Sequence, residues 1–435
     1  MTTLPWTIRG LRSSLASHAV RPSELAEQAL ARSNANAGHN TYLWQDAAWT
    51  RAEAVRAEAE PRPFGDGPNK LWGLPISVKD CFDLAGSPTS CGVRFYRDLN
   101  GPAPHDSSLV RQLRAAGAVI TGKTHLHPLA YGITGKNPDF GDCLQPGNPA
   151  ALTGGSSSGA AASVLEGSAV AAIGTDTGGS IRAPAALCGL AGYRATHGRG
   201  NWSGAAHLAE SFDTMGVIFR DLEDAPLLAS LFVAAPPAPI VRFERIGVIG
   251  NSFFDDCEPE IIDSLHVTVH EFEPLGLHTS VVNVDWWADS FEIFAPIQAW
   301  EAARIHAGHF EQIDPSIRER LEWGARITLN EITSLRQRHA DFRARMDELL
   351  SKHDLLLLPA IPIAHLAAGA DHSQTRTRLL RYTTPFSLAG VPVVTIPCGH
   401  GGMQLAAAYG NDEALLQLAA QLGARRNAKA PSSRP

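Results

Sequence analysis

Three short segments carry residue types that could together support nucleophilic catalysis. Lys79 ends an apolar, β-branched segment, and Ser156 and Ser180 each lie in a glycine-rich loop. A serine hydroxyl is a poor nucleophile at neutral pH and needs a base within hydrogen-bonding reach. No histidine accompanies any of the three segments, so Lys79 is the candidate base.

A lysine can act as a base only in its uncharged form. With the ordinary pKa of about 10.4, almost every lysine side chain is protonated at pH 7. Burial beside apolar neighbours lowers the pKa of an ammonium group. Because Lys79 directly follows the apolar segment Ile76–Val78, the sequence predicts that its amine is buried.

The loop that holds Ser180 could also stabilise negative charge. Attack of a serine on a carbonyl produces an oxyanion, which backbone N–H groups stabilise when they already point at it. Glycines let the chain curl into such a nest at the start of a helix. The candidate donors are the backbone amides of Thr177, Gly178, Gly179 and Ser180.

Three other patterns are weaker on inspection of their context. Residues 117–124 match a phosphate-binding loop, but residues 118–120 are predicted to form a strand instead of a flexible loop. Ser157 matches the centre of a nucleophile elbow, yet a proline-containing loop precedes it where a strand is required. His125 and His127 have no third ligand nearby, so we expect neither a metal ion nor another cofactor.

The chain resembles the amidase signature family from Leu25 to Gly423. Ser156 precedes Ser180 by 24 residues, which is the family's spacing. The matching segments, in order, are Gly73–Asp80, Gly122–Thr124, Tyr131–Thr134, Asn137–Gly141, Thr153–Gly159, Gly174–Arg182 and Pro385–Pro392. Ser158 is a mild departure, because many relatives have glycine there.

The resemblance implies roles for individual residues. Ser180 would be the nucleophile, and Ser156 would relay its proton to Lys79. A cis peptide bond would join Gly155 to Ser156, and hydrolysis would pass through an acyl-enzyme. Other family positions are a supporting set, Gly155, Ser157, Asp176 and Arg182, and an acyl-pocket set, Ala130, Tyr131, Gly132 and Ile133, with residues near Tyr382–Phe386.

Two further arginines leave an alternative open. Arg378 and Arg381 could bind an anionic substrate, or they could lie on a solvated helix face. The sequence favours the second interpretation, because charged residues at such positions usually contact water.

The elements that must position these residues alternate between strands and helices. This order predicts an α/β fold, a single large domain whose central twisted, mostly parallel mixed sheet is covered by helices on both faces. The predicted strands are Leu74–Val78, Ala118–Thr121, Ala169–Ile173, Arg245–Ile249, Thr279–Val284, Asp354–Leu358, Val391–Ile396 and Gln404–Ala408. The predicted helices are one beginning near Arg21, Asp46–Ala59, Asp106–Ala116, Ala160–Leu165, Ile181–Leu187, Ala299–Phe310 and Asp412–Leu422.

The whole chain sets the domain and partner expectations. No linker divides its 435 residues, so we expect one domain over residues 1–425, with N-terminal helices in 1–62 packing on the core and a disordered tail over 426–435. The net charge of −7 is spread evenly, which argues against nucleic acid, and no segment is apolar enough to cross a membrane. We expect a cytoplasmic protein and allow for a homodimer.

The leading functional hypothesis is an amidohydrolase that cleaves a C–N bond of a small amide, urea derivative or carbamate. Two alternatives stay open. One is the glutaminase-type A subunit of a tRNA amidotransferase, and the other is a non-catalytic binding homologue. The short chain without an evident basic surface argues against the first, and the presence of Lys79, Ser156 and Ser180 argues against the second.

Overall fold

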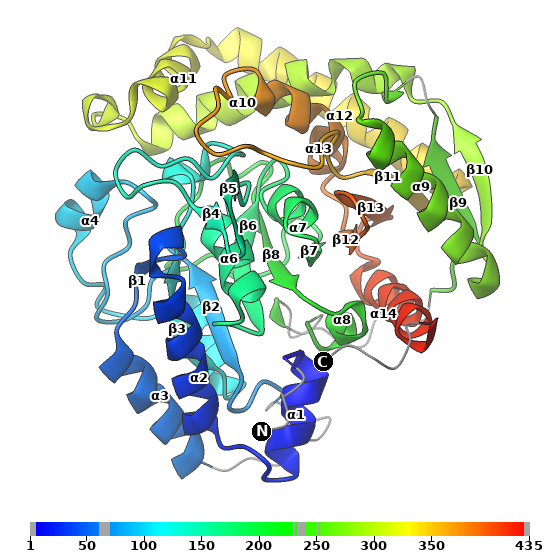
Figure 1. Ribbon diagram of the computed structural model, residues 1–435. Coiled ribbons are helices and arrows are strands. Elements are labelled where there is room, and N and C mark those ends of the chain that lie inside the picture. The colour runs from blue at the N-terminus through cyan, green and yellow to red at the C-terminus, as the bar shows by residue number, and fades with distance from the viewer. Residues whose placement is uncertain (1–5, 61–69, 229–230, 233–240, 251–252, 430–435) are drawn as a thin grey trace.

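An eleven-stranded mixed β-sheet runs through the molecule, and helices cover both of its faces (Figure 1). The computed structural model describes residues 6–60, 70–228, 231–232, 241–250 and 253–429. The strand order is β1-β3-β2-β6-β8-β7-β12-β13-β11-β9-β10, and β4 and β5 form a separate hairpin. The strands are β1 (Tyr42–Trp44), β2 (Pro75–Lys79), β3 (Val119–Thr124), β4 (Leu144–Gln145), β5 (Asn148–Leu152), β6 (Ala171–Asp176), β7 (Ala191–Arg194), β8 (Thr214–Phe219), β9 (Arg245–Ile249), β10 (His278–Val282), β11 (Leu355–Pro359), β12 (Val393–Pro397) and β13 (Gly402–Ala407).

The predicted α/β class and mixed sheet are confirmed, and every predicted strand is present within three residues of its expected ends. Parallel neighbours lie toward the two sides of the sheet, in β3-β2-β6 and in β11-β9-β10. The strands between them pair antiparallel. The sequence did not predict the short strands β1, β4 and β5, nor β7 and β8. Strands β7 and β8 are buried throughout and therefore lack an alternating pattern.

Helices pack on both sides of this sheet, and all those predicted are present. The helices are α1 (Ile8–Ala16), α2 (Pro22–Ala35), α3 (Ala47–Ala59), α4 (Arg94–Asn100), α5 (Ser108–Ala115), α6 (Ser158–Glu166), α7 (Arg182–Leu187), α8 (Ala225–Leu228), α9 (Pro259–Phe272), α10 (Ser290–Ile305), α11 (Pro315–Arg326), α12 (Leu329–Lys352), α13 (Thr375–Ala389) and α14 (Asp412–Lys429). The helix expected over 299–310 both begins and ends earlier, because α10 covers Ser290–Ile305.

The two ends of the described chain lie together on one short segment. Arg9 of α1 and Asn427 of α14 both donate to Asp221 and Glu223. Helix α14 runs through Lys429, so the first four residues of the expected disordered tail are helical; residues 430–435 lie outside the described part, as do residues 61 and 62 of the expected N-terminal helical region.

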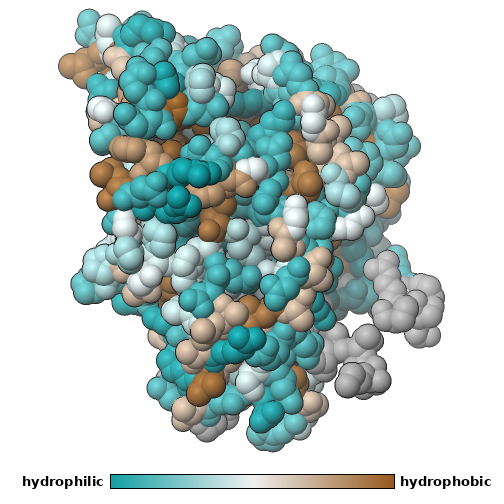
Figure 2. All heavy atoms as spheres, turned by 60° about the vertical axis from the view of Figure 1, so that its left-hand side comes forward, coloured by the Kyte–Doolittle hydropathy of each residue, from teal (hydrophilic) through white to brown (hydrophobic). Residues whose placement is uncertain are grey.

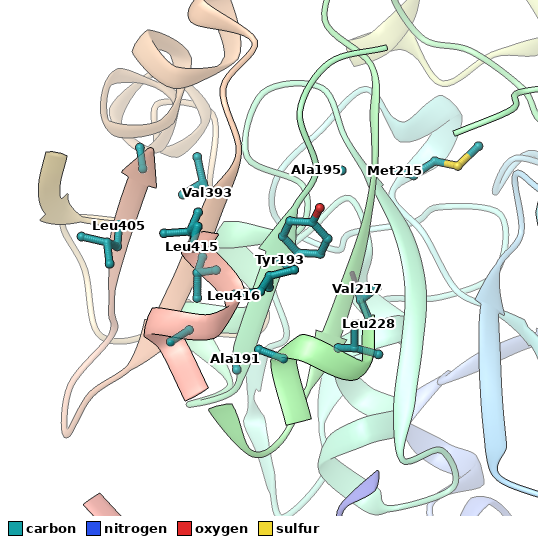
Figure 3. Close-up of a cluster of buried hydrophobic side chains, with 14 of the residues drawn as sticks. Ala191, Tyr193, Ala195, Met215, Val217, Leu228, Val393, Leu405, Leu415 and Leu416 are labelled. Atoms are coloured by element: carbon teal, nitrogen blue, oxygen red, sulfur yellow. The ribbon is translucent and has the colours of Figure 1, made fainter. Parts of the chain in front are cut away.

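The core is continuous between the middle of the sheet and the helices α8 and α14 (Figure 3). Val217 of β8, Leu405 of β13 and Leu415 of α14 have no exposed surface. Burying a side chain of this size stabilises the fold by roughly 1.5–3 kcal/mol. The buried Tyr193 hydroxyl donates to Asp412 Oδ1 at 2.7 Å, and this bond anchors the first turn of α14 to β7.

Within residues 6–429, apart from the gaps given above, no helix is both long and apolar enough to cross a bilayer. On the face turned forward in Figure 2, apolar side chains are scattered among hydrophilic ones.

The strands β2 and β6 pair side by side and carry two of the three segments singled out in the sequence. Helix α6 follows the third segment and packs against both strands. The first turn of α6 packs closely against the backbone at Thr41. A Cβ atom on Gly159 would lie 2.1 Å from the Thr41 carbonyl oxygen. The fold therefore brings Lys79, Ser156 and the Ser180 loop to the carboxyl ends of β2 and β6.

Candidate active site

Lys79 is the last residue of β2 and has no exposed surface. Its Nζ atom lies 2.8 Å from Ser156 Oγ and 2.8 Å from Thr175 Oγ1. Burial lowers the pKa of Lys79 to about 8, because the negative groups around it offset only part of the lost hydration. A useful fraction of this amine is therefore uncharged near neutral pH.

A second buried lysine shows what the Lys79 environment lacks. Lys123 of the adjacent strand β3 also has no exposed surface, but its Nζ lies 2.7 Å from Asp80 Oδ1. Lys123 Nζ additionally donates to the Pro88 carbonyl and the Thr89 hydroxyl. In the described chain no carboxylate lies within 4.0 Å of Lys79 Nζ, whose two partners are hydroxyl groups.

The loop that holds Ser156 is fixed by backbone contacts on both sides. The peptide bond between Gly155 and Ser156 is cis, as the family resemblance implies. The Gly155 amide donates to the Ile133 carbonyl at 2.8 Å, and the Ser156 carbonyl accepts from the His127 amide at 3.1 Å. The Ser158 hydroxyl also donates to the Ser156 carbonyl, so this family departure adds a contact to the loop.

Ser180 follows β6 in a tight turn that leads into α7. Gly179 has φ +118°, and a Cβ atom there would lie 2.8 Å from the Thr383 side chain, so only glycine fits. The Ser157 amide donates to the Ser180 carbonyl at 3.2 Å and joins the two serine loops. Ser180 is 5% exposed, so little of it contacts solvent.

Asp176 organises the Ser180 turn. Its carboxylate accepts from the amides of Gly179 and Ile181 and from the guanidinium groups of Arg182 and Arg194. Burial alone would raise the pKa of Asp176, but the charges of the two arginines outweigh it and hold the pKa well below its usual range. Asp176 therefore stays ionised and carries the negative charge that the buried arginines need.

The amides predicted to stabilise an oxyanion are not equivalent. Gly179 N–H already donates to Asp176 Oδ1 at 2.7 Å. Within the part of the chain that the structure describes, the amides of Thr177, Gly178 and Ser180 donate to no protein acceptor. Buried backbone amides without partners are rare, and neighbouring ones form a nest that suits an anion.

Thr177 is held from the other side by a polar network. Its hydroxyl donates to Asp213 Oδ1 at 2.6 Å, and Asp213 Oδ2 lies 3.0 Å from His207 Nδ1. Burial lowers the pKa of His207, but the hydrogen bond and charge of Asp213 outweigh this and leave the pKa raised. This network fixes Thr177, the first of the four predicted donors.

A narrow pocket opens onto the Ser180 turn. Ala130, Tyr131, Gly132 and Ile133, which the resemblance assigns to the acyl pocket, line it together with Thr177, Gly178 and Ser180. From α13 the lining residues are Arg376 and Leu380, while the expected segment 382–386 is buried in the core. Gln298 of α10 completes the wall.

The structure defines the surroundings of the two arginines whose role the sequence left open. Arg378 and Arg381 pair with Asp256 and Asp255 and lie outside the pocket lining, so they are surface ion pairs.

The Ser157 hydroxyl donates to the Thr175 carbonyl. Strand β3 occupies 119–124, which excludes a phosphate loop there. Among the described residues no cluster of three or more His, Cys, Asp or Glu side chains could hold a metal ion.

Sequence reasoning missed several residues that contact the site. Thr175 lies near the end of β6, in the same matching segment as Ser180, and could have been noticed from that position. Arg194 and Arg376 come from a distant strand and a distant helix, and nothing in their local sequence marks them. Thr383 lies in the expected segment 382–386, and its hydroxyl donates to the Gly178 carbonyl.

Comparisons with known proteins find amidases among the proteins similar to this chain. A family model described as Amidase matches residues 24–239. Indoleacetamide hydrolase of Pseudomonas savastanoi is 32% identical over 91% of this chain and 90% of that protein. A glutamyl-tRNA(Gln) amidotransferase subunit of Akkermansia muciniphila is 30% identical over 93% of this chain and 95% of that protein. A crystal structure of an amidase superimposes with a TM-score of 0.86 at 30% identity, covering 96% of this chain and 99% of that one.

Proposed function

Since the chain belongs to the amidase signature family, we propose that it hydrolyses the C–N bond of a small amide, urea derivative or carbamate through a covalent acyl-enzyme on Ser180. It is an amidohydrolase that acts on carbon–nitrogen bonds other than peptide bonds. Its substrate and the roles of its residues are the parts that we propose.

The proton path begins at Lys79. The uncharged amine accepts the Ser156 proton across 2.8 Å, and Ser156 in turn accepts the proton of Ser180. Ser180 Oγ then bonds to the substrate carbonyl carbon. Thr175, the second partner of Lys79 Nζ, holds the amine in position for this transfer.

Negative charge then develops on the substrate oxygen. The amides of Thr177, Gly178 and Ser180 are the proposed donors to it, and Gly179 serves instead to fix the turn against Asp176. The C–N bond breaks as Ser156 returns a proton to the departing nitrogen. Water then attacks the acyl-enzyme, with Ser156 and Lys79 again taking its proton, and Ser180 is released.

The observation that carries this proposal is the environment of Lys79. The fold places a lysine amine against two hydroxyls, away from any acid partner among the described residues, and burial brings its pKa to about 8. A lysine with only a structural role would be expected to have a counter-charge, as Lys123 has in Asp80.

The test is an assay of the purified chain alone against a panel of small amides, ureas and carbamates, with ammonia or amine release measured. Turnover by the chain alone supports the proposal. Relatives of similar identity include a component of an amidotransferase, so the same panel is run with glutamine and added partner proteins. Activity that appears only with partners, or no activity with Lys79, Ser156 and Ser180 intact, would overturn the proposal.

A further inference from the structure

Arg376 is the one charged side chain among the described residues that line the Ser180 pocket. The rest of the lining consists of small, apolar, hydroxyl and amide groups from the Ser180 turn, the 130–133 segment and the helices α10 and α13. Arg376 belongs to the first turn of α13, and it lines the same pocket as Ser180.

The Arg376 guanidinium has no carboxylate partner in the described chain. Its Nη2 donates to Gln298 Oε1 at 2.8 Å, and its Cζ lies 5.5 Å from the ring centroid of Tyr131 and 5.9 Å from that of Phe291. Burial, reinforced by the charge of Arg320, lowers the pKa of Arg376 to about 10, so the group is still charged at neutral pH. The bond to Gln298 fixes its orientation and leaves its other N–H groups available.

A second cation strengthens the local positive potential. Arg320 also contacts Tyr131. Its Cζ lies 4.6 Å from the Tyr131 ring centroid, and its Nη1 donates to the Tyr131 carbonyl. No carboxylate lies within 4.0 Å of Arg320 in the described residues either. Two guanidinium groups therefore flank Tyr131 without a counter-ion from the described part of the protein.

The neighbouring arginines on the same helix show the usual alternative. Arg378 lies 3.0 Å from Asp256, and Arg381 lies 2.8 Å from Asp255. Surface arginines are thus neutralised within the protein, whereas the one that reaches the pocket is not. A partly desolvated cation without a partner is costly, so its presence beside a reactive serine calls for an anionic ligand.

We propose that the substrate is a small amide that also carries a carboxylate, and that Arg376 binds this carboxylate while the scissile carbonyl lies at Ser180. This inference rests on the proposed amidase function and adds the substrate class. A guanidinium forms two parallel hydrogen bonds to a planar carboxylate, which would fix the substrate's position as well as its charge. The narrow pocket favours a short spacer between the carboxylate and the amide.

The test compares monoamides of three- to six-carbon dicarboxylic acids with neutral alkyl amides of the same length. The wild-type chain should have the higher kcat/KM for the anionic series. Arg376→Met should lower kcat/KM for the anionic substrates by about 30-fold or more, mainly through KM, because the substrate loses a charge-assisted contact. The neutral amides should change by less than about 3-fold. Arg376→Lys keeps the charge but not the planar fork. Its kcat/KM for the anionic substrates should lie between the values of wild type and Arg376→Met.

Arg381→Met is the matched control, since it removes an arginine from the same helix outside the pocket lining. It should leave both substrate series unchanged. A wild-type preference for neutral amides, or an equal loss of both series in Arg376→Met, would overturn the carboxylate assignment.

A binding measurement separates this inference from the proposed function. The Ser180→Ala protein is titrated calorimetrically with the same monoamides, alone and combined with Arg376→Met. One outcome is that the Ser180→Ala protein binds a monoamide only when Arg376 is present, while the wild-type chain hydrolyses no amide. That result would support the carboxylate site and reject the proposed catalysis. Hydrolysis of amides by the wild type, with no Arg376-dependent binding of any monoamide, would support catalysis and reject the carboxylate site.

Discussion

The activity of this chain should depend on pH through the protonation of Lys79. The perturbation is pH itself, varied from 6 to 10 with a neutral amide, so that neither the substrate nor its contact with Arg376 titrates. Only the uncharged amine can accept the Ser156 proton across their 2.8 Å separation. The rate should therefore follow the uncharged fraction of Lys79.

The expected magnitude follows from the pKa of about 8 that burial gives Lys79. At pH 7 about 9% of such amines are uncharged, against about 0.04% for an ordinary lysine with a pKa of about 10.4. Burial thus increases the amount of active base at pH 7 by about 200-fold. Below pH 8 the rate should rise about tenfold per pH unit, and above it the rate should level off.

The assay is kcat/KM across this range, because that ratio reports the ionisation of the free enzyme. Circular dichroism at each pH controls for unfolding. A flat profile between pH 6 and 9 would refute the argument, and so would a rate that still rises about tenfold between pH 9 and 10, since that is the behaviour of a hydrated lysine.

Three substitutions test other parts of the site. Ser180→Ala should abolish turnover while leaving the melting temperature within a few degrees of wild type, which kinetics and thermal unfolding measure together. Asp176→Asn should lower the free energy of unfolding by about 3–5 kcal/mol in denaturant titrations, because two buried arginines lose their counter-charge; a change below about 1 kcal/mol would contradict that account. Gly179→Ala should lower kcat by about 100-fold or more, since the added Cβ meets Thr383 at 2.8 Å and displaces the neighbouring amides; unchanged kcat would show that the turn tolerates the displacement.

The sequence predicted the parts of the site that lie in continuous segments. Lys79, Ser156 and Ser180 each belong to a short motif with unusual composition, so their proximity could be expected once the motifs were read in order. The strand that positions Lys79 was predictable because its β-branched, apolar residues are typical of a buried strand.

The rest depended on contacts between distant parts of the chain. Arg194 reaches Asp176 only because β7, an unpredicted strand, lies two places from β6 in the sheet. Arg376 differs from Arg378 only in the direction in which each side chain leaves α13, and the sequence pattern does not encode which one meets an acid. The substrate pocket was therefore the least predictable part of the site.

The most direct test is an NMR titration of the Lys79 side chain in protein labelled at the lysine carbons, with the signal assigned by its loss in Lys79→Met. The account predicts a transition centred near pH 8, where burial places the pKa of this amine. A transition near pH 10.4, the value of a lysine in water, would show that the amine is protonated throughout the physiological range and would contradict the mechanism.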